Sequence, residues 1–193
     1  MVENRTGKED AVPAASESSV TAQRERKLEE LFDAHADRVL RAAYRLTGNA
    51  EDAEDVLQTV FLRLARRENA PDLRPSPGSY LQRAAVNAAL DQLRARRSRV
   101  VELDGGAPGA TLASNGTPED DQRGRDLRRA LRSALSDMSP KVAEIFVLRD
   151  LEGYGNREIA QMVDSTPGSV AVLLHRARRE LRERFRDFLG DGS

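Results

Sequence analysis

The chain of 193 residues contains no cysteine and no tryptophan. The absence of cysteine excludes disulfides, thiolate metal sites, cysteine nucleophiles and thiol-based redox sensing by this chain. Aromatic residues make up only 4% of the sequence, so large aromatic clusters do not hold the fold together. The two histidines, His35 and His175, lie far apart in the sequence, and no group of residues has the spacing of a metal site.

Long apolar segments are missing as well. No apolar run approaches the ~20 residues that a membrane-spanning helix needs, and the N-terminus lacks the apolar core of a signal peptide. The segment Thr6-Gly7-Lys8 lacks the upstream glycine of a phosphate-binding loop, and no nucleophile–base pair is recognisable. We therefore expect a cytoplasmic protein with no membrane insertion, no catalytic residues, no metal and no cofactor.

The chain also lacks a large net charge, because 31 basic and 32 acidic residues leave only −1. The charges are segregated along the sequence instead. Residues 83–99 hold five arginines and one acid, and residues 176–186 hold six arginines and two acids. Between them, residues 100–121 hold five acids and no base. Since local patches set the electrostatic footprint of a nucleic-acid-binding protein, this pattern favours a chain that contacts DNA at two points.

Helical periodicity recurs along the chain and no clear strand pattern does, so we predict an all-α fold of two small helical domains. A disordered tail is expected over residues 1–25 and a first helical module over 26–98. A flexible acidic linker, rich in glycine and turn residues, is expected over 99–123. A second helical module would then occupy residues 124–190.

Each predicted helix carries apolar residues at three- and four-residue steps. Asn49 is an expected N-cap. Ser139, followed by Pro140, is expected to begin a helix that Gly153 ends. The predicted helices span residues 26–46, 49–67, 79–97, 126–136, 139–152, 156–163 and 167–188.

A polar ridge is predicted on the third of these helices, where Arg83, Asn87, Asp91 and Arg94 step by four, four and three residues along one face. The ridge is a candidate surface for nucleic acid. Asn87 and Asp91 of the ridge also have the four-residue spacing of an intrahelical pair. The arginines that follow the ridge, Arg96, Arg97 and Arg99, could instead reflect the helix dipole, which favours cations near a C-terminus.

Residues 157–170 have the pattern of a helix-turn-helix. Small Ala160 allows the two helices to cross closely, and Asp164 tolerates the left-handed conformation that the tight turn needs. Thr166 is an expected N-cap for a second helix that Pro167 opens. The N-terminus of that helix suits the major groove of DNA. An ordinary helical hairpin is the alternative, and the basic run that follows favours the DNA-binding interpretation.

Four stretches of the chain resemble the extracytoplasmic-function (ECF) sigma factors, the minimal two-domain subunits that direct bacterial RNA polymerase to promoters. The stretches are residues 46–64, 80–94, 147–153 and 174–178, and the resemblance extends over residues 27–187. It implies an alternative sigma factor that binds bacterial core RNA polymerase, recognises promoter DNA and initiates transcription at specific promoters. It also implies control by an anti-sigma factor.

The resemblance further implies roles for individual residues. The residues that bind core polymerase would be Asp52, Asp55, Gln58 and Phe61. Those that bind the minus-ten DNA would be Asn87, Asp91, Arg94, Arg96, Arg97 and Arg99. The helix-turn-helix would contact DNA through Arg157, Thr166, Ser169, His175, Arg176, Arg178 and Arg179. The acids near the start of a helix also have a simpler cause, because the helix dipole favours them there.

The sequence departs from the family pattern in the expected recognition helix. Ala171 and Leu173 fill positions where the family usually has lysine or arginine. Base readout would then depend on Ser169, on apolar contacts such as one with a thymine methyl group, or on DNA shape. We therefore expect a weaker or unusual minus-thirty-five preference. Tyr80 replaces a usual tryptophan and is expected to be a core aromatic.

A free-standing helix-turn-helix transcriptional regulator is the main alternative function. The polar ridge of the first module, which lacks a dimerisation stripe, argues against it. A non-DNA adaptor is a more distant alternative, suggested by the apolar Val172 and Leu173 on the recognition helix. The sequence leaves open whether the two modules pack together.

Overall fold

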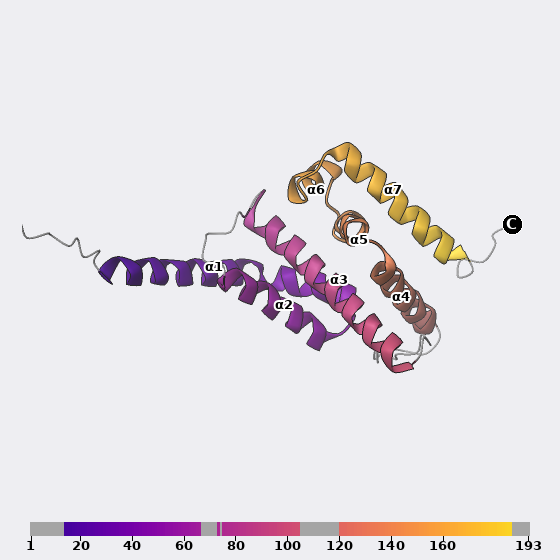
Figure 1. Ribbon diagram of the computed structural model, residues 1–193, viewed down its shortest axis with the longest axis horizontal. Helices are drawn as coiled ribbons and strands as arrows, with labels where there is room; N and C mark the ends of the chain where they lie inside the picture. Colours follow the sequence, from indigo (N-terminus) through magenta and orange to yellow (C-terminus); the bar gives the residue numbers. More distant parts are fainter. Residues whose placement is uncertain (1–13, 67–72, 74, 105–119, 187–193) are drawn as a thin grey trace, which may run out of the picture.

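The computed structural model describes residues 14–66, 73, 75–104 and 120–186. These residues form helices and connecting turns, with no strand among them, which confirms the predicted all-α class (Figure 1). None of the described helices is long and apolar enough to cross a membrane. The elements are α1 (Ala14–Thr47), α2 (Ala50–Ala65), α3 (Pro77–Asp104), α4 (Asp120–Asp137), α5 (Pro140–Phe146), a π-helical turn (Val147–Leu151), α6 (Asn156–Met162) and α7 (Pro167–Arg184).

The structure corrects the expected boundaries of the tail and the linker. Helix α1 already begins at Ala14, so residues 14–25 are helical, whereas residues 1–13 lie outside the described part. Helix α3 continues to Asp104 and α4 begins at Asp120, so only residues 105–119 of the expected linker are left undescribed. Extending an existing helix adds one hydrogen bond per residue without a new nucleation cost, and residues 14–25 contain no proline or glycine to stop it.

The predicted caps and turns are largely confirmed. The Glu51 amide donates to Asn49 Oδ1 over 3.0 Å at the start of α2. Asp164 has φ 49° in the turn before α7, and Gly153 has φ 80° where the π-helical turn ends. Ser139 occupies the N-cap position of α5, but its side chain makes no capping hydrogen bond.

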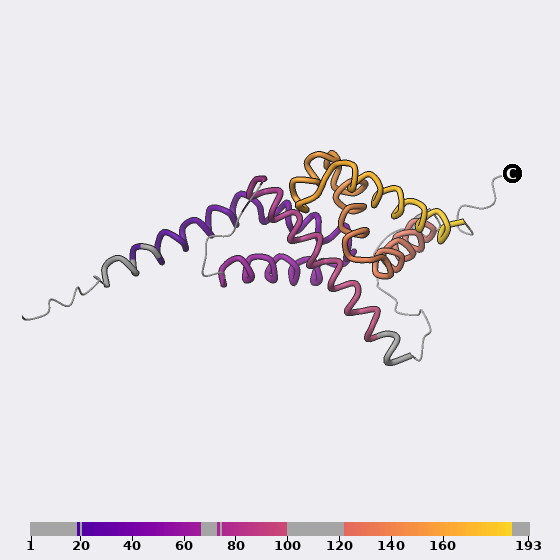
Figure 2. Tube along the Cα trace, turned by 45° about the horizontal axis from the view of Figure 1, so that its top comes forward, coloured from indigo at the N-terminus to yellow at the C-terminus, as the bar shows by residue number. Residues whose placement is uncertain are grey.

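Helix α3 lies at the centre of the molecule. Figure 1 shows it running between the pair α1–α2 and the group α4–α7, and Figure 2 shows the same order from another direction. Because both groups contact it, α3 is buried on several sides. Small residues permit this close approach from two directions. The buried side chains of α3 are Leu81, Gln82, Ala85, Val86, Ala88, Ala89, Leu90 and Leu93.

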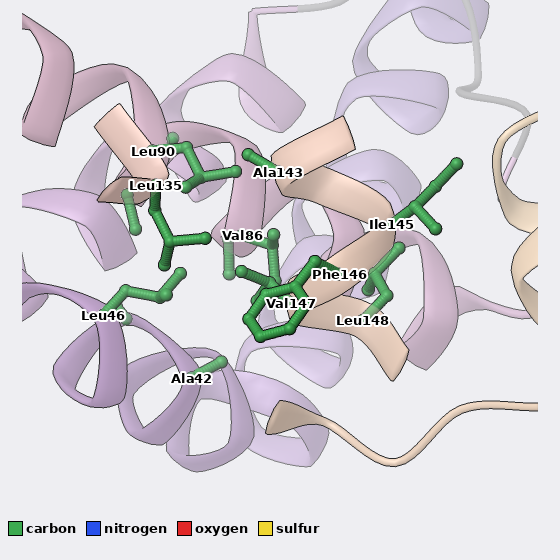
Figure 3. Packing of buried hydrophobic residues seen from close by; sticks show 14 of the residues in the cluster. Ala42, Leu46, Val86, Leu90, Leu135, Ala143, Ile145, Phe146, Val147 and Leu148 are labelled. Atoms are coloured by element: carbon green, nitrogen blue, oxygen red, sulfur yellow. The ribbon is translucent and has the colours of Figure 1, made fainter. Parts of the chain in front are cut away.

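The two modules share one hydrophobic core. Helices α1–α3 form the first module and α4–α7 the second, and the buried side chains of both belong to a single contiguous cluster. The structure thus answers the question that the sequence leaves open, because the modules pack together. Figure 3 shows the centre of this core, where α1 contributes Ala42 and Leu46, α3 contributes Val86 and Leu90, α4 contributes Leu135, and α5 contributes Ala143, Ile145 and Phe146.

Candidate nucleic-acid interface

The N-terminal half of the polar ridge faces the second module. The Nε atom of Arg83 donates to Glu144 Oε1 of α5 over 2.6 Å, and Asn87 Nδ2 donates to the same oxygen over 2.9 Å. A second donor of Arg83 bonds the carbonyl of Met162 at the end of α6. The Glu144 side chain is only 7% exposed. One buried carboxylate of the second module therefore engages two ridge residues at once.

The C-terminal half of the ridge is more open. Asp91 is exposed, and Arg94 donates to it over 3.4 Å. The Nη2 atom of Arg94 is buried and has no hydrogen-bond partner among the described residues. The alternative in which Asn87 pairs with Asp91 is not the arrangement seen, because Asn87 bonds Glu144 instead.

The three arginines that follow the ridge have different environments. Arg96 forms an ion pair with Asp52 of α2. Arg97 bonds α4 of the second module, with its Nε 2.8 Å from Asp137 Oδ1 and its Nη1 2.8 Å from Ser133 Oγ. Arg99 is exposed near the end of α3. In this conformation Arg99 is therefore the most accessible of the three to a phosphate.

Asp52 belongs to a buried polar cluster. Its side chain is 4% exposed, and Gln92 Nε2 donates to Oδ1 over 3.2 Å beside the Arg96 ion pair. Its second oxygen, Oδ2, has no partner within the described part of the chain. Burial raises the pKa of Asp52 above its usual value, although Arg96 acts in the opposite direction. The structure thus places Asp52 and Arg96 in one cluster, although the resemblance assigns them to two different partners.

The other three residues predicted to bind core polymerase lie on two faces of α2. Phe61 is buried and meets Phe32 of α1 edge to face, with ring centroids 4.9 Å apart. Asp55 and Gln58 are exposed. Leu62 is also exposed, although the sequence pattern did not single it out. The available signal was that Leu62 is apolar but lies off the predicted buried stripe of α2.

The helix-turn-helix is formed by α6 and α7. Ile159 and Ala160 of α6 are buried, as are Val170 and Leu174 of α7, so the two helices cross through apolar and small residues. Val172 is 69% exposed on the opposite face of α7. The predicted DNA-contacting residues are all exposed, namely Arg157, Thr166, Ser169, His175, Arg176, Arg178 and Arg179.

The start of α7 is ordered by hydroxyl groups. The Ser169 amide donates to Thr166 Oγ1 over 3.1 Å, which confirms Thr166 as the N-cap. The two hydroxyl oxygens also lie within hydrogen-bond distance, 2.9 Å apart. Both residues are exposed at the helix end that would meet DNA, where free amides and the helix dipole favour phosphate.

The arginines of α7 differ in how tightly they are held. Arg178 makes two hydrogen bonds to Asp150 of the π-helical turn, of 2.6 and 3.1 Å, and this contact raises its pKa. Arg176 donates to Glu180 one turn later on the same helix over 2.8 Å. The Arg178–Asp150 contact spans 28 residues of sequence and therefore also holds α7 against the π-helical turn of the second module.

The described residues contain no group of three or more His, Asp or Glu side chains that could hold a metal ion. The exposed groups of the candidate interface are the arginines of α3, α6 and α7 and the hydroxyls of Thr166 and Ser169 at the start of α7. These groups suit the binding of phosphates and base edges.

Comparison with known proteins matches both modules. The family model described as Sigma-70 region 2 matches residues 31–99, and Sigma-70, region 4 matches residues 128–181. The chain is 35% identical over 159 residues to the ECF RNA polymerase sigma factor SigE of Mycolicibacterium smegmatis, covering 80% of this chain and 60% of that protein. It is 34% identical over 159 residues to the RNA polymerase sigma factor CarQ of Myxococcus xanthus, covering 80% of this chain and 87% of that protein.

Among solved structures, the sigma factor RpoE of Bartonella quintana, crystallised with the anti-sigma factor NepR, aligns with a TM-score of 0.48. The sequences are 20% identical, and the alignment covers 83% of this chain and 95% of that chain.

Proposed function

Because this chain belongs to the ECF group of RNA polymerase sigma factors, we propose that it binds bacterial core RNA polymerase and directs it to a specific set of promoters. One observation carries the proposal: the region 2 match falls on α1–α3 and the region 4 match falls on α4–α7, the module that holds the helix-turn-helix. Core polymerase works in the cytoplasm, so the proposal includes a cytoplasmic location. Control by an anti-sigma factor is proposed on family membership alone.

The exposed face of α2 is the proposed contact with core polymerase. Asp55 and Gln58 would touch polymerase directly, and Leu62 would add apolar area beside them. Asp52 and Phe61 would act indirectly, because both are buried and hold α2 against α3 and α1.

The ridge and the helix-turn-helix are the proposed DNA contacts. Asn87, Asp91 and Arg94 would read the separated minus-ten strand, with the arginines 96, 97 and 99 near its phosphates. The exposed residues of α7 and Arg157 of α6 would contact duplex DNA upstream. This division assigns single-stranded DNA to the first module and double-stranded DNA to the second.

Run-off transcription with purified bacterial core polymerase tests the proposed function. The template is a set of genomic fragments that includes the region upstream of the gene for this chain. We expect specific transcripts only when the chain is added. Duplex DNA binding by the chain alone, without transcripts and without co-elution with core polymerase, would instead support the free-standing regulator.

Two single substitutions on α7 are expected to separate phosphate contact from base readout. Arg176→Ala removes an exposed cation, so it should weaken binding to all duplexes similarly and reduce the slope of log K against log salt by about one. Val172→Ala removes an exposed apolar group suited to a thymine methyl, so it should change which sequences are bound.

Binding selection from random duplex DNA, repeated at several salt concentrations, measures both effects. Arg99→Ala, which removes an exposed arginine outside the helix-turn-helix, serves as the charge-matched control for duplex binding. A sequence-selective loss in Arg176→Ala, or unchanged selection in Val172→Ala, would contradict the two assignments.

A further inference from the structure

Helix α4 carries a third arginine-rich segment, which the proposed DNA contacts do not use. Residues 122–136 hold five arginines and one acid, Asp126, which leaves a net charge of +4. The segments 83–99 and 176–186, which hold the proposed DNA contacts, each have the same net charge. Because local patches set the electrostatic footprint of a protein, α4 is a candidate for a further contact with an anion.

Four of the five arginines lie on one face of α4. They are spaced at i, i+3, i+4 and i+7, which places side chains of an α-helix side by side. At a rise of about 1.5 Å per residue, they extend over roughly 10 Å of the helix axis. The acids Asp126 and Asp137 lie roughly 110–130° away around that axis. We call this surface the arginine face, and its members are Arg125, Arg128, Arg129 and Arg132.

The two flanks of α4 contact different neighbours. Asp137, which lies away from the arginine face, bonds Arg184 of α7. Arg132 instead lies against the turn between α1 and α2, where a Cβ on Gly48 would be only 2.5 Å from its Nη1. Figure 1 shows α4 beside α3 and the C-terminal part of α7, which it contacts. The arginine face is therefore separate from the helix-turn-helix.

The cations of the arginine face have few anionic partners. Among the described residues, Arg132 makes no hydrogen bond or ion pair, and Arg128 meets no carboxylate. Arg128 donates instead to the carbonyl of Gly124 over 3.1 Å. Arg129 lies 3.2 Å from Asp126 in a solvent-accessible pair. Burial lowers the pKa of Arg132, and the positive charges of Arg128 and Arg129 lower it further.

The arginines of α7 are neutralised to a greater extent. Arg176 bonds Glu180 over 2.8 Å, and Arg178 bonds Asp150 over 2.6 Å. Like charges one turn apart on a helix repel each other, so an uncompensated cluster of them is unfavourable. A bound anion would remove that repulsion. The arginine face thus presents positive charge that the chain itself leaves largely uncompensated.

The shape of the arginine face indicates which anion fits it. Guanidinium groups present paired N–H donors that match the oxygens of phosphate. A row of such groups suits a chain of phosphates better than one compact anion. A DNA duplex presents two rows of phosphates, one on each side of a groove, whereas the arginine face is a single row. At about 3.4 Å per nucleotide of one strand, its length matches roughly three phosphates.

We propose that the arginine face of α4 binds the phosphate backbone of a single nucleic-acid strand, independently of base sequence. Arg128, Arg129 and Arg132 would make the phosphate contacts. This site goes beyond the proposed promoter contacts, because it gives the second module a strand-binding surface in addition to its duplex-binding helix-turn-helix. It needs neither polymerase nor a promoter, so it can be measured on the chain alone.

Arg128→Gln/Arg132→Gln tests the proposal, because it removes two cations of the arginine face and keeps most of each side chain. The probe is a fluorescent single strand of about twelve thymines, which offers phosphates without a varied base sequence. Each phosphate contact contributes about 0.7 to the slope of log K against log salt for a single strand. We expect the slope to fall by about 1.4, and binding at about 0.1 M salt to weaken roughly 25-fold.

Arg41→Gln/Arg123→Gln is the charge-matched control. Both arginines are exposed, Arg41 on α1 and Arg123 on the flank of α4 opposite the arginine face. This variant removes the same net charge without touching the proposed site, so strand binding should stay near the parental value. Arg128→Gln/Arg129→Gln changes only exposed residues and keeps the test informative if the loss of the partly buried Arg132 prevents folding. It is expected to weaken strand binding in the same way.

Two further probes identify the ligand, namely a DNA duplex of the same length and a polyglutamate peptide of the same charge. The arginine variants should lose much less affinity for either probe than for the single strand. An equal loss for the duplex would show that the face binds any DNA, and an equal loss for polyglutamate would assign it to an acidic protein surface. Either result, or unchanged strand binding in both arginine variants, would overturn the proposal. Failure of the proposed function would appear only in the run-off experiment, because these measurements contain no polymerase.

Discussion

Replacing Arg96 with alanine is expected to lower the free energy of unfolding by about 3–5 kcal/mol at neutral pH, the range for breaking a buried ion pair by removing one partner. The reason is the environment of Asp52. Its carboxylate is 4% exposed, its second oxygen already lacks a partner, and Arg96 is its only ion-pair partner among the described residues. Without the guanidinium, a buried charge would remain with Gln92 alone.

The same substitution is expected to have a pH-dependent effect. Burial raises the pKa of Asp52, so the folded chain binds a proton more readily than the unfolded chain does. Stability contributed by this group is therefore greatest below the ordinary carboxyl pKa and falls as the pH rises through the folded pKa. Losing Arg96 raises the folded pKa further, so the destabilisation should be smaller in acid than at neutral pH.

Urea denaturation of the parent and of Arg96→Ala at several pH values measures both effects. Arg99→Ala, an exposed arginine one turn further along α3, is the control and should stay within about 0.5 kcal/mol of the parent. Asp52→Asn/Arg96→Ala should recover most of the loss, because it removes the stranded charge. If Arg96→Ala behaves like Arg99→Ala, the pair contributes nothing to stability and Arg96 is free to contact DNA.

Leu90→Ala is expected to destabilise the whole chain by about 2–5 kcal/mol. Leu90 is 1% exposed on α3 and lies in the part of the shared core that Figure 3 shows. Its loss leaves a cavity where the two modules meet. Because both modules bury side chains in one cluster, we expect a single unfolding transition. Its midpoint should move to a lower denaturant concentration by the same amount in both modules.

Chemical denaturation followed by a dye in each module tests this prediction. Leu127→Ala is the matched control, since Leu127 is 46% exposed on α4 and should change the free energy of unfolding by about 0.5 kcal/mol or less. Two separate transitions, with only the first-module signal shifted by Leu90→Ala, would show that the modules unfold independently in spite of their shared core.

These two variants concern the same helix, and together they show why α3 is sensitive to change. One set of its residues builds the core from both sides, and two residues of the polar ridge, Arg83 and Asn87, bond α5 and the end of α6. Separating the modules would expose apolar surface of α3 that the shared core buries.

Local features of the fold could be predicted from the sequence because their causes lie within a few residues. The N-caps Asn49 and Thr166, the left-handed Asp164 and the stop at Gly153 each depend on the intrinsic geometry of one or two residues. The all-α class and the helix-turn-helix follow from apolar periodicity in the same way. The start of α1, the end of α3 and the start of α4 could not be placed, because residues 14–25 and 120–125 are mostly polar or small and residues 98–104 do not form a clear apolar stripe.

The polar contacts of the site were decided by the tertiary structure alone. Glu144 meets Asn87 across 57 residues, Glu152 meets Gln82 across 70, and Arg96 meets Asp52 across 44. The sequence around Glu144 does not identify the residue that bonds it. An acid within the buried run 142–148 does indicate that a polar or charged partner is needed. The sequence alone determines which side chains carry charge and which face of a helix is apolar. Which charges meet depends on how the helices pack, because burial makes an ion pair necessary and only the packed fold brings its two members within reach.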